Sequence, residues 1–283
     1  MNNLNRIKSL QETLPYLHDT SSKKIVIKYG GSAMTDPDLT LSVIQDIATL
    51  SLLGFKIILV HGGGPAINEW LERLQIKPKF KNGIRITDSR TMELVQMVLS
   101  GKINKDLVGT LGSLNVRAVG LSGKDGQLIL ADSIELYAEN KVGKIRVIDT
   151  HILEILLENQ YLPVVAPIGT NESGLSFNIN ADTVASEIAS AIKASSLIML
   201  TDTPGILKDF SAPDTLYPNL DLKNLEELIN NGTIVGGMLP KVHGCIKALK
   251  DGVQSIRIID GRLPHSLLLT LLSEAHVGSV LTL

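Results

Sequence analysis

Two glycine-rich turns, each placed directly after a short apolar segment, constrain this sequence more than any other feature. The first turn, residues 28–32 (KYGGS), follows segment 24–27, and the second, residues 61–65 (HGGGP), follows segment 56–60. A strand that ends in consecutive glycines and continues into a helix leaves backbone N–H groups free to face an anion. The two turns therefore predict one phosphate or carboxylate site that is contacted from two sides.

The pattern around the turns predicts an α/β fold. We expect strands at 24–29 and 56–60 and helices at 37–53 and 65–74. A helix that links two parallel strands forms a right-handed βαβ unit, and ligands in open α/β sheets bind at the carboxyl ends of the strands, where both turns lie. The hydrophobic fraction of 44%, with only 4% aromatic residues, fits aliphatic strands buried under helices.

The remaining segments continue this alternation. A hairpin is expected over 79–88, with Asn82–Gly83 as its tight turn, and a β ribbon through 127–149. The other expected helices are 89–101, 102–114, 151–159, 183–194, 222–230, 240–251 and 264–272. The other expected strands are 116–121, 162–166, 196–201, 206–208, 254–259 and 278–282.

Three parts of the chain are predicted from this pattern. Segment 169–174 (GTNESG) is the most linker-like stretch and separates a lobe of residues 21–173 from a lobe of residues 174–283. Residues 1–20 precede them and contain an amphipathic helix at 4–17, in which Pro15 forces a bend. The apolar stripe of this helix can pack on its own domain or against a neighbouring subunit, and the sequence is compatible with both.

Composition excludes several classes of function. The 27 Lys and Arg residues against 29 Asp and Glu, a net charge of −2, disfavour nucleic acid as the main partner. The single Cys245 excludes an internal disulfide and is expected to be a packed thiol. No apolar run approaches the roughly 18 to 20 residues that cross a bilayer, and residues 1–20 lack the apolar centre of a signal peptide, so a soluble, non-secreted protein is expected.

Two lysines and an aspartate are the strongest candidates for chemistry. Lys28 precedes Gly30 and Gly31, so its ammonium can reach an anion held by that turn, and Lys241 opens a helix, where a cation is unfavourable unless an anion binds there. Two ammonium groups of this kind would flank a transferred phosphoryl group, and Asp182 could hold both in position. The alternative is a pair of solvated lysines and a helix-capping aspartate.

Further polar residues suggest binding rather than catalysis. Arg85 lies between Ile84 and Ile86 and could grip a carboxylate with both arms of its guanidinium, although a surface ion pair is the commoner role. Asn178 and Asn180 share one face of an extended segment with Asp182, and can equally cap the next helix. The loop 201–205 is either a nucleotide-contacting loop or a plain tight turn, and we assign His61 and Trp70 structural roles. Neither a Walker A loop nor a G-x-G-x-x-G fingerprint occurs.

Six motifs, taken in order, resemble those of the amino acid kinase family. They are KYGGS at 28–32, VHGGGP at 60–65, NGIRIT at 82–87, FNINAD at 177–182, LTDTPGI at 200–206 and GGMLPK at 236–241. The resemblance extends from about residue 24 to the end of the chain. It implies a three-layer αβα sandwich with a central, mainly parallel eight-stranded sheet, an N-terminal lobe for an acyl amino acid and a C-terminal lobe for MgATP.

The same resemblance implies a reaction and a set of roles. The order and spacing of the motifs match those members that transfer the γ-phosphoryl group of ATP to the side-chain carboxylate of N-acetyl-L-glutamate, a step of arginine biosynthesis. Lys28 and Lys241 would stabilise the transition state and Asp182 would orient them, without a metal ligand from the protein. The residues implied in acceptor binding are Gly63, Gly64, Arg85, Asn178 and Asn180; those implied in nucleotide binding are Gly30, Gly31, Thr201, Asp202, Gly205 and Gly237.

The N-terminal helix resembles that of arginine-inhibited members, in which it interlaces dimers into a hexamer. The residues implied in an L-arginine site are Tyr16, Lys223, Glu274 and Gly278. The tail departs from that pattern at Thr270 and Ala275, where acidic residues are usual. Some plastid and cyanobacterial members also bind the P-II signal protein, and the implied location is the cytoplasm or the plastid stroma. The alternatives are a sibling kinase acting on glutamate, aspartate, carbamate or a nucleoside monophosphate, and a non-catalytic amino-acid sensor.

Overall fold

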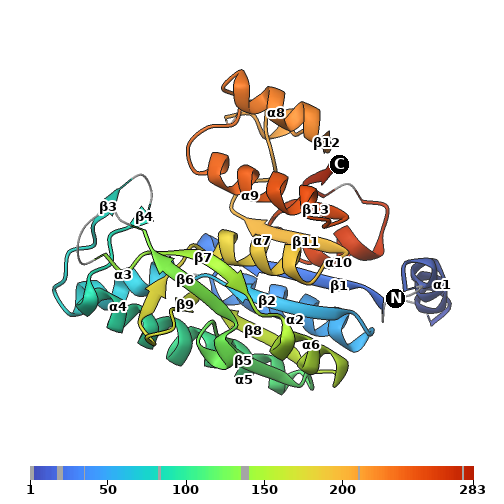
Figure 1. Ribbon diagram of the computed structural model, residues 1–283. Coiled ribbons are helices and arrows are strands. Elements are labelled where there is room, and N and C mark those ends of the chain that lie inside the picture. Colours follow the sequence, from blue (N-terminus) through green and yellow to red (C-terminus); the bar gives the residue numbers. More distant parts are fainter. Residues whose placement is uncertain are drawn as a thin grey trace.

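An eight-stranded sheet forms the centre of the protein (Figure 1). The computed structural model describes residues 3–17, 22–34, 36–81, 84–134, 140–209, 211–275 and 277–283. The strands, in spatial order, are β12 (Asn219–Asp221), β14 (Ser279–Thr282), β13 (Ser255–Asp260), β11 (Ser196–Thr201), β1 (Lys24–Tyr29), β2 (Lys56–His61), β8 (Leu162–Ala166) and β5 (Ala118–Ser122). Neighbouring strands run parallel except β13 and β14, which are antiparallel. The predicted mainly parallel eight-stranded sheet is therefore confirmed.

Helices cover both faces of this sheet. The described helices, of which α1 lies apart from the sheet, are α1 (Asn3–Thr13), α2 (Pro37–Leu52), α3 (Gly64–Arg73), α4 (Ser89–Gln96), α5 (Asn104–Ser113), α6 (His151–Glu158), α7 (Ala181–Ala191), α8 (Leu222–Asn230), α9 (Met238–Lys250) and α10 (Ser266–Leu272). Shorter 3₁₀ turns lie at η1 (Leu14–Leu17), η3 (Gly31–Met34), η5 (Asp125–Gln127) and η6 (Pro213–Thr215). Within the described residues, no helix is long and apolar enough to cross a membrane.

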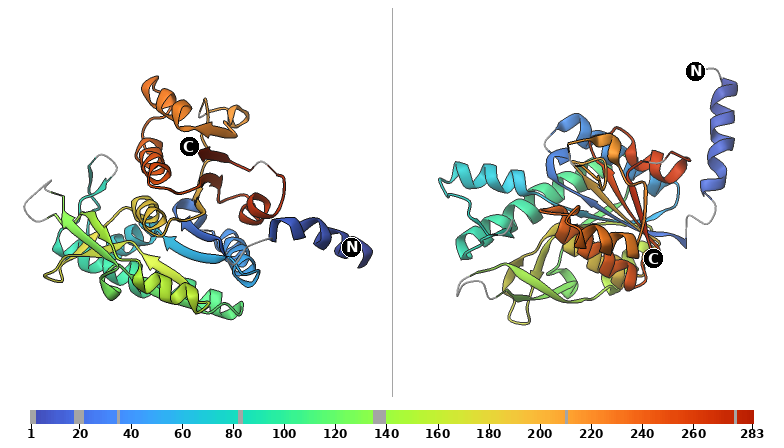
Figure 2. Two further views of the ribbon diagram at one scale, coloured as in Figure 1. Left: turned by 45° about the vertical axis from the view of Figure 1, so that its right-hand side comes forward. Right: turned by 90° about the horizontal axis from the view of Figure 1, so that it is seen from above.

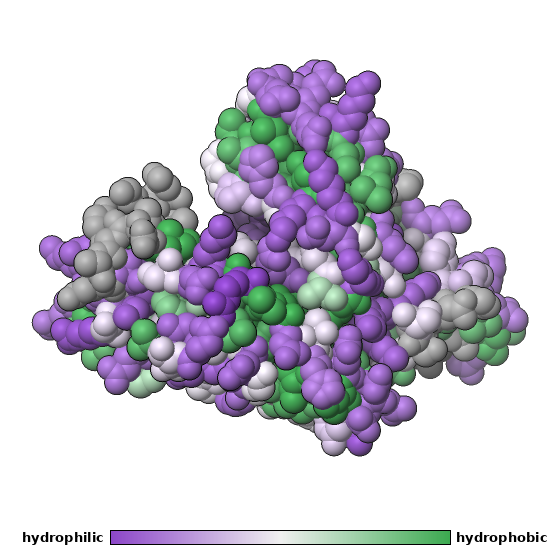
Figure 3. Space-filling view, in the orientation of Figure 1, coloured by the Kyte–Doolittle hydropathy of each residue, from purple (hydrophilic) through white to green (hydrophobic). Residues whose placement is uncertain are grey.

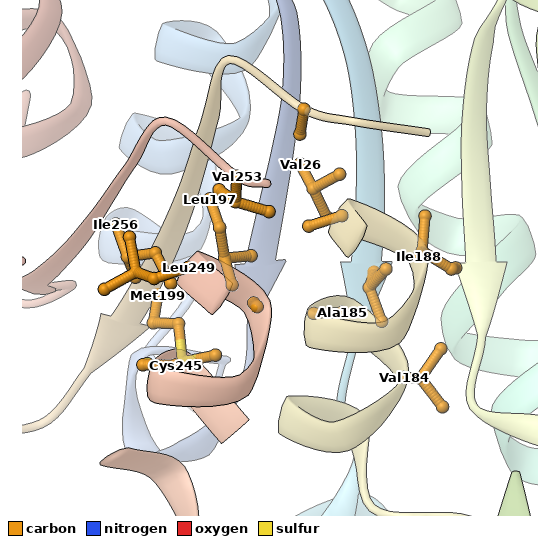
Figure 4. Packing of buried hydrophobic residues seen from close by; sticks show 14 of the residues in the cluster. Val26, Val184, Ala185, Ile188, Leu197, Met199, Cys245, Leu249, Val253 and Ile256 are labelled. Carbon is orange, nitrogen blue, oxygen red and sulfur yellow. The ribbon is translucent and has the colours of Figure 1, made fainter. Parts of the chain in front are cut away.

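The alternation of side chains along each strand divides the core into two layers. Val26 of β1 belongs to a cluster with α6 to α9, whereas its neighbours Ile25 and Ile27 belong to a cluster with α2 to α5 and α10. Figure 4 shows side chains of α7 and α9 packing toward those of the strands. Cys245 is fully buried there, and burial raises the pKa of its thiol to about 12. The predicted αβα layering and the packed thiol are both confirmed.

The first βαβ unit forms for local reasons that the sequence contains. Asp36 caps α2, since one of its carboxylate oxygens accepts the N–H groups of Asp38 and Leu39, at 2.9 and 3.1 Å. In the resulting register Lys28 of β1 lies opposite Val60 of β2. The two glycine turns therefore begin at the same level, at the carboxyl edge of the sheet.

Smaller sheets lie beside the central one. A four-stranded sheet has the order β10 (Ser176–Asn178), β9 (Ile168–Thr170), β6 (Ile129–Ser133) and β7 (Gly143–Ile148), which confirms the predicted β ribbon. β3 (Phe80–Lys81) and β4 (Ile84–Arg85) form the predicted hairpin, while its turn, Asn82–Gly83, lies outside the described residues. The linker-like segment 169–174 is in fact the end of β9 and the turn toward β10, closed by a bond from the Gly174 N–H to the Asn171 carbonyl at 2.9 Å.

Two expectations about secondary structure are wrong. Instead of separate helices at 89–101 and 102–114, α4 and α5 are joined by an uninterrupted π-helical segment, η4 (Met97–Ile103). Gly101 lowers helix propensity, but it keeps its backbone N–H group and does not end the helix, so helical structure continues from α4 through η4 into α5. The expected strand 206–208 is reduced to a single bridge between Leu207 and Leu216.

The N-terminal helix stands away from the rest of the molecule in both views of Figure 2. It ends at Thr13, and Pro15 lies in the following turn η1, as the proline predicts. Ile7 and Leu14 of its apolar stripe are each 55% exposed. These two side chains of the stripe are therefore largely uncovered within this chain.

Candidate functional site

The two glycine turns lie against each other at the carboxyl ends of β1 and β2. The N–H of Gly62 donates to the carbonyl of Tyr29 at 2.7 Å. A Cβ added at Gly30 would lie 3.1 Å from the Lys28 Nζ and 3.4 Å from the Gly62 Cα, so a side chain there would crowd the end of the lysine and touch the second turn. The absence of side chains lets two turns and a lysine ammonium share one place.

The ammonium of Lys28 belongs to a three-residue cluster. Its Nζ lies 3.0 Å from one carboxylate oxygen of Asp182, and the Nζ of Lys241 lies 2.7 Å from the other oxygen. Lys28 is the next-to-last residue of β1, Asp182 is in the first turn of α7 and Lys241 is in the first turn of α9. Both lysine side chains are only 11% exposed and that of Asp182 is 22% exposed. The structure thus brings together the three residues that the sequence singled out for chemistry.

The charge of the cluster favours a further anion. Burial alone would raise the pKa of Asp182, but the charges of Lys28 and Lys241 lower it to about 2. The carboxylate is therefore ionised at neutral pH and serves to hold the two ammonium groups rather than to carry a proton. One carboxylate against two lysines leaves a formal charge of +1, and Lys241 also lies at the positive end of the α9 dipole.

A cavity of about 380 Å³, which we call the Arg85 cavity, lies on one side of this cluster. Its lining includes Lys28, Gly31, Gly62, Gly63, Gly64, Arg85, Asn178, Asn180 and Asp182. Arg85 is 8% exposed, and its Nη2 donates to the side-chain oxygen of Asn68 at 2.7 Å. Its Nη1 is buried without an acceptor among the described residues. A buried guanidinium nitrogen that lacks an acceptor is suited to a ligand carboxylate.

The two asparagines of this cavity have different partners. The amide nitrogen of Asn178 donates to the hydroxyl of Thr87 at 3.2 Å, and that hydroxyl donates to the carbonyl of Arg85 at 3.0 Å. Asn180 is the N-cap of α7, because its side-chain oxygen accepts the N–H groups of Asp182 and Thr183. Asn178 therefore ties β10 to the Arg85 segment, while Asn180 fixes the start of the helix that carries Asp182.

A second cavity of about 470 Å³, which we call the Thr201 cavity, lies on the other side of the cluster. Its lining includes Lys28, Gly30, Gly31, Asp182, Thr201, Asp202, Gly205, Gly237 and Lys241. Lys28, Gly31 and Asp182 line both cavities. The two cavities consequently meet at the Lys28–Asp182–Lys241 cluster. Figure 3 shows a hollow in this face of the molecule between the part that carries α8 and α9 and the part that carries β3 and β4.

The four residues expected at a regulatory site line neither cavity. Tyr16 is half-buried in η1, which contacts α10, whereas Lys223 on α8 and Glu274 after α10 are exposed. Gly278 has φ +78°, and an added Cβ would lie 2.2 Å from the carbonyl oxygen of Ile258. The local backbone therefore requires glycine at this position whether or not a ligand binds nearby.

Sequence reasoning missed Asn68 and Thr87, which hold Arg85 and Asn178 in place. Asn68 lies on α3, one turn beyond Gly64, and Thr87 is two residues beyond Arg85. A buried guanidinium needs hydrogen-bond acceptors, so the burial of Arg85 would predict that acceptors are present. The sequence does not show which residues they are. In the part of the chain that the structure describes, no group of three or more His, Cys, Asp or Glu side chains could hold a metal ion.

A parallel α/β sheet with two cavities that meet at a lysine–aspartate–lysine cluster defines a phosphoryl-transfer enzyme of the αβα type. Two adjoining cavities give room for a donor and an acceptor, and phosphoryl transfer requires positive charge of the kind that the two lysines supply. The chain belongs to the amino acid kinase family, whose model matches residues 23–260.

Relatives with known names cover nearly the whole chain. A protein of Pyropia yezoensis named acetylglutamate kinase is 49% identical over 282 residues, which cover 99% of both chains. Another of that name from Nostoc sp. (strain PCC 7120 / SAG 25.82 / UTEX 2576) is 48% identical over 276 residues, 98% of this chain and 93% of its own.

Solved structures of lower identity share the fold. N-acetylglutamate synthase from Neisseria gonorrhoeae, complexed with coenzyme A and N-acetyl-glutamate, gives a TM-score of 0.85 at 23% identity, with 98% of this chain covering 63% of that one. Carbamate kinase from Giardia lamblia bound to AMP-PNP gives a TM-score of 0.64 at 17% identity, with coverage of 92% and 98%. At these identities the likeness concerns the fold alone.

Proposed function

We propose that this protein transfers the γ-phosphoryl group of ATP to the side-chain carboxylate of N-acetyl-L-glutamate. An oxygen of that carboxylate attacks the γ-phosphorus, the bond between the γ-phosphorus and the bridging oxygen breaks, and the products are N-acetyl-L-glutamyl 5-phosphate and ADP. The observation that carries the proposal is the meeting of the two cavities at the Lys28–Asp182–Lys241 cluster. The relatives named acetylglutamate kinase support the choice of acceptor.

The residues of the cluster would act by electrostatics. A carboxylate is already ionised at neutral pH, so the acceptor needs no general base. Lys28 and Lys241 would neutralise charge on the transferring phosphoryl group, and Asp182 would keep both ammonium groups between the cavities. These interactions strengthen as charge develops, so they lower the barrier rather than merely bind the substrates.

The acceptor would occupy the Arg85 cavity. The free Nη1 of Arg85 would bind a carboxylate of N-acetylglutamate, Asn178 would contact its other polar groups, and the N–H groups of Gly63 and Gly64 would face it. Asn180 supports the cavity by capping α7. Residues 21–173, the first lobe, would contribute most of the residues that line the Arg85 cavity. Residues 174–283, the second lobe, would contribute most of those that line the Thr201 cavity.

The nucleotide would occupy the Thr201 cavity, whose lining includes all six residues expected to contact it: Gly30, Gly31, Thr201, Asp202, Gly205 and Gly237. We propose that Mg²⁺ arrives with ATP, where it would neutralise phosphate oxygens. The Asp182 carboxylate is occupied by two lysines. This arrangement fits a metal held mainly by phosphates rather than by the protein.

A hydroxylamine trap tests the acceptor. The protein is incubated with MgATP, hydroxylamine and N-acetylglutamate, glutamate, aspartate or carbamate in turn, and hydroxamate and ADP are measured. We expect hydroxamate from N-acetylglutamate alone. An equal yield from glutamate or aspartate would favour a sibling kinase, and absence of ADP release with every acceptor would favour a non-catalytic sensor.

We also propose that L-arginine inhibits the enzyme and that α1 joins dimers into a hexamer, a trimer of dimers. The exposed stripe of α1 and the contact between η1, which carries Tyr16, and α10 support this placement. Activity and sedimentation in millimolar L-arginine test it, and no change in either would contradict it. A P-II partner and a cytoplasmic or plastid location rest on the family resemblance and stay predictions.

A further inference from the structure

A buried pair of polar side chains lies behind the second glycine turn and has no part in the mechanism above. His61 is the last residue of β2 and is 0% exposed. Asn104 begins α5, directly after the π-helical segment η4, and is 1% exposed. Neither lines the Arg85 cavity or the Thr201 cavity. Burying two polar side chains costs free energy unless they form hydrogen bonds, so the hydrogen-bond partners of this pair determine that cost.

The partners of Asn104 fix the position of the proton on His61. The Asn104 Nδ2 lies 2.9 Å from the Val164 carbonyl oxygen and 3.3 Å from the Leu121 carbonyl oxygen. Both can only accept, so the side-chain nitrogen, not the oxygen, must face them. The same Nδ2 lies 3.2 Å from the His61 Nε2 and, because Nδ2 can only donate, Nε2 can bond to it only as an acceptor without a proton, sharing the two amide hydrogens with the two carbonyls. The proton of the neutral ring is on Nδ1, which donates to the carbonyl of Gly62 at 2.8 Å.

This hydrogen bond orients the peptide group between Gly62 and Gly63. The bond is trans, and in a trans peptide the C=O and the following N–H point in opposite directions. Because the Gly62 carbonyl faces His61, the Gly63 N–H faces away from it, and no described residue accepts this N–H. Gly62 and Gly63 line the Arg85 cavity.

Side chains of the π-helical segment η4 pack directly against the Cα of Gly63. A Cβ added there would lie 2.5 Å from the side chains of Leu99 and Ile103, both in η4. Asn104 is the residue that follows the same segment. The π-helical segment therefore packs against Gly63, and it also positions the next residue, Asn104, whose side chain sets the His61 tautomer.

We propose that His61 and Asn104 are positioning residues for acceptor binding. Asn104 selects the Nδ1–H form of His61, the Nδ1–H bond holds the Gly62–Gly63 peptide, and the N–H of Gly63 is thereby presented to an oxyanion of the acceptor in the Arg85 cavity. The identity of that acceptor rests on the proposed function, whereas the orientation of the peptide does not. Burial, which lowers the pKa of His61 to about 4, keeps the ring in the neutral form that this arrangement requires.

Two matched substitutions test the proposal. In His61→Asn the amide nitrogen can occupy the place of Nδ1 and keep the donor to Gly62, whereas in His61→Gln it reaches the place of Nε2 and loses that donor. A hydrogen bond to a charged group is worth about 10- to 100-fold in binding. We expect His61→Gln to weaken binding of N-acetylglutamate by about that factor, and His61→Asn to stay close to the wild type. The KM for ATP should be unchanged in both.

Binding of N-acetylglutamate is measured by titration calorimetry and KM by steady-state kinetics. Equal losses in the two variants, or equal effects on the acceptor and on ATP, would assign His61 a packing role and overturn the proposal. If the wild type phosphorylates another acceptor, the same comparison is made with that acceptor. The acceptor that the wild type uses then tests the proposed function. The ratio of the binding losses in His61→Gln and His61→Asn tests the positioning role separately.

A measurement on the wild type does not depend on the folding of any variant. In ¹H–¹⁵N spectra of protein labelled with ¹⁵N-histidine, His61 should give the signals of a neutral ring with its proton on Nδ1 at pH 7. The signals are assigned by their loss in either variant, or by exclusion through substitution of the other histidines. A proton on Nε2, or a cationic ring, would overturn the proposal.

Discussion

Replacing Asp182 by asparagine removes one charge from the centre of the site and leaves the shape nearly unchanged. Lys28 and Lys241, each 11% exposed, then face a neutral amide at 3.0 and 2.7 Å in place of a carboxylate. The lowering of the pKa of Asp182 from 3.8 to about 2 corresponds to about 2.5 kcal/mol. Removing one partner of a buried pair costs about 3 to 5 kcal/mol. We therefore expect a loss of about 3 kcal/mol in unfolding free energy and a fall in Tm of about 5 to 10 °C.

The effect on catalysis should be larger than the effect on nucleotide binding. Without the carboxylate the two ammonium groups repel and lose their position, so kcat should fall by about 100-fold or more. In the proposed site a nucleoside triphosphate would bring negative charge to the two ammonium groups, so a non-hydrolysable ATP analogue should raise the Tm of Asp182→Asn more than that of the wild type.

Denaturant unfolding, thermal melts with and without the analogue, and initial rates measure these quantities. Asp202→Asn is the matched control, because it removes an exposed carboxylate from the Thr201 cavity that does not lie between the lysines. We expect it to leave Tm unchanged. A variant Asp182→Asn with wild-type kcat and Tm would refute the electrostatic role of the cluster.

Three further predictions follow from the same contacts. Lys241→Ala should lower kcat by about 10²- to 10⁴-fold with a smaller change in KM, because its proposed contact with the phosphoryl group would strengthen in the transition state. Steady-state kinetics measure this, and an unchanged kcat would make Lys241 an ordinary solvated lysine. Arg85→Lys should raise KM for N-acetylglutamate and leave KM for ATP unchanged, since one ammonium cannot replace a guanidinium that contacts Asn68 and, in the proposed complex, would also contact the ligand; equal changes in both KM values would contradict this. Stability should decrease by about 2 kcal/mol between pH 7 and pH 5, because the unfolded chain protonates His61 near 6.5 and the folded protein only near 4. The stabilisation is complete above pH 6.5 and is lost as the pH falls toward 4; urea unfolding of His61→Asn should lack this loss, and the exposed His151→Asn should retain it.

The sequence by itself determined the features that depend on near neighbours. The glycine turns and the change in period between strands and helices are local, and they predicted the βαβ unit and the edge of the sheet where ligands bind. The π-helical segment was missed because its hydrophobic period resembles that of an ordinary helix. Segment 169–174 forms a hairpin turn between β9 and β10, which the sequence could not distinguish from a linker because a polar, glycine-rich stretch is equally typical of both.

Only the tertiary structure decided which distant residues meet. Lys28, Asp182 and Lys241 come together because β11 lies beside β1 and because α7 and α9 begin at the same edge of the sheet. No spacing in the chain encodes that adjacency. Before the fold was known, the chemistry of these side chains suggested that they act together and the family resemblance implied it, but neither gave their positions. The same holds for His61, which sequence reasoning assigned a structural role. Its proton is placed by Asn104 and by carbonyl groups of Leu121 and Val164, which come from other elements of the fold. Hydrogen bonds act over about 3 Å in space regardless of separation along the chain, so the chemistry of such a side chain is set by the packing around it.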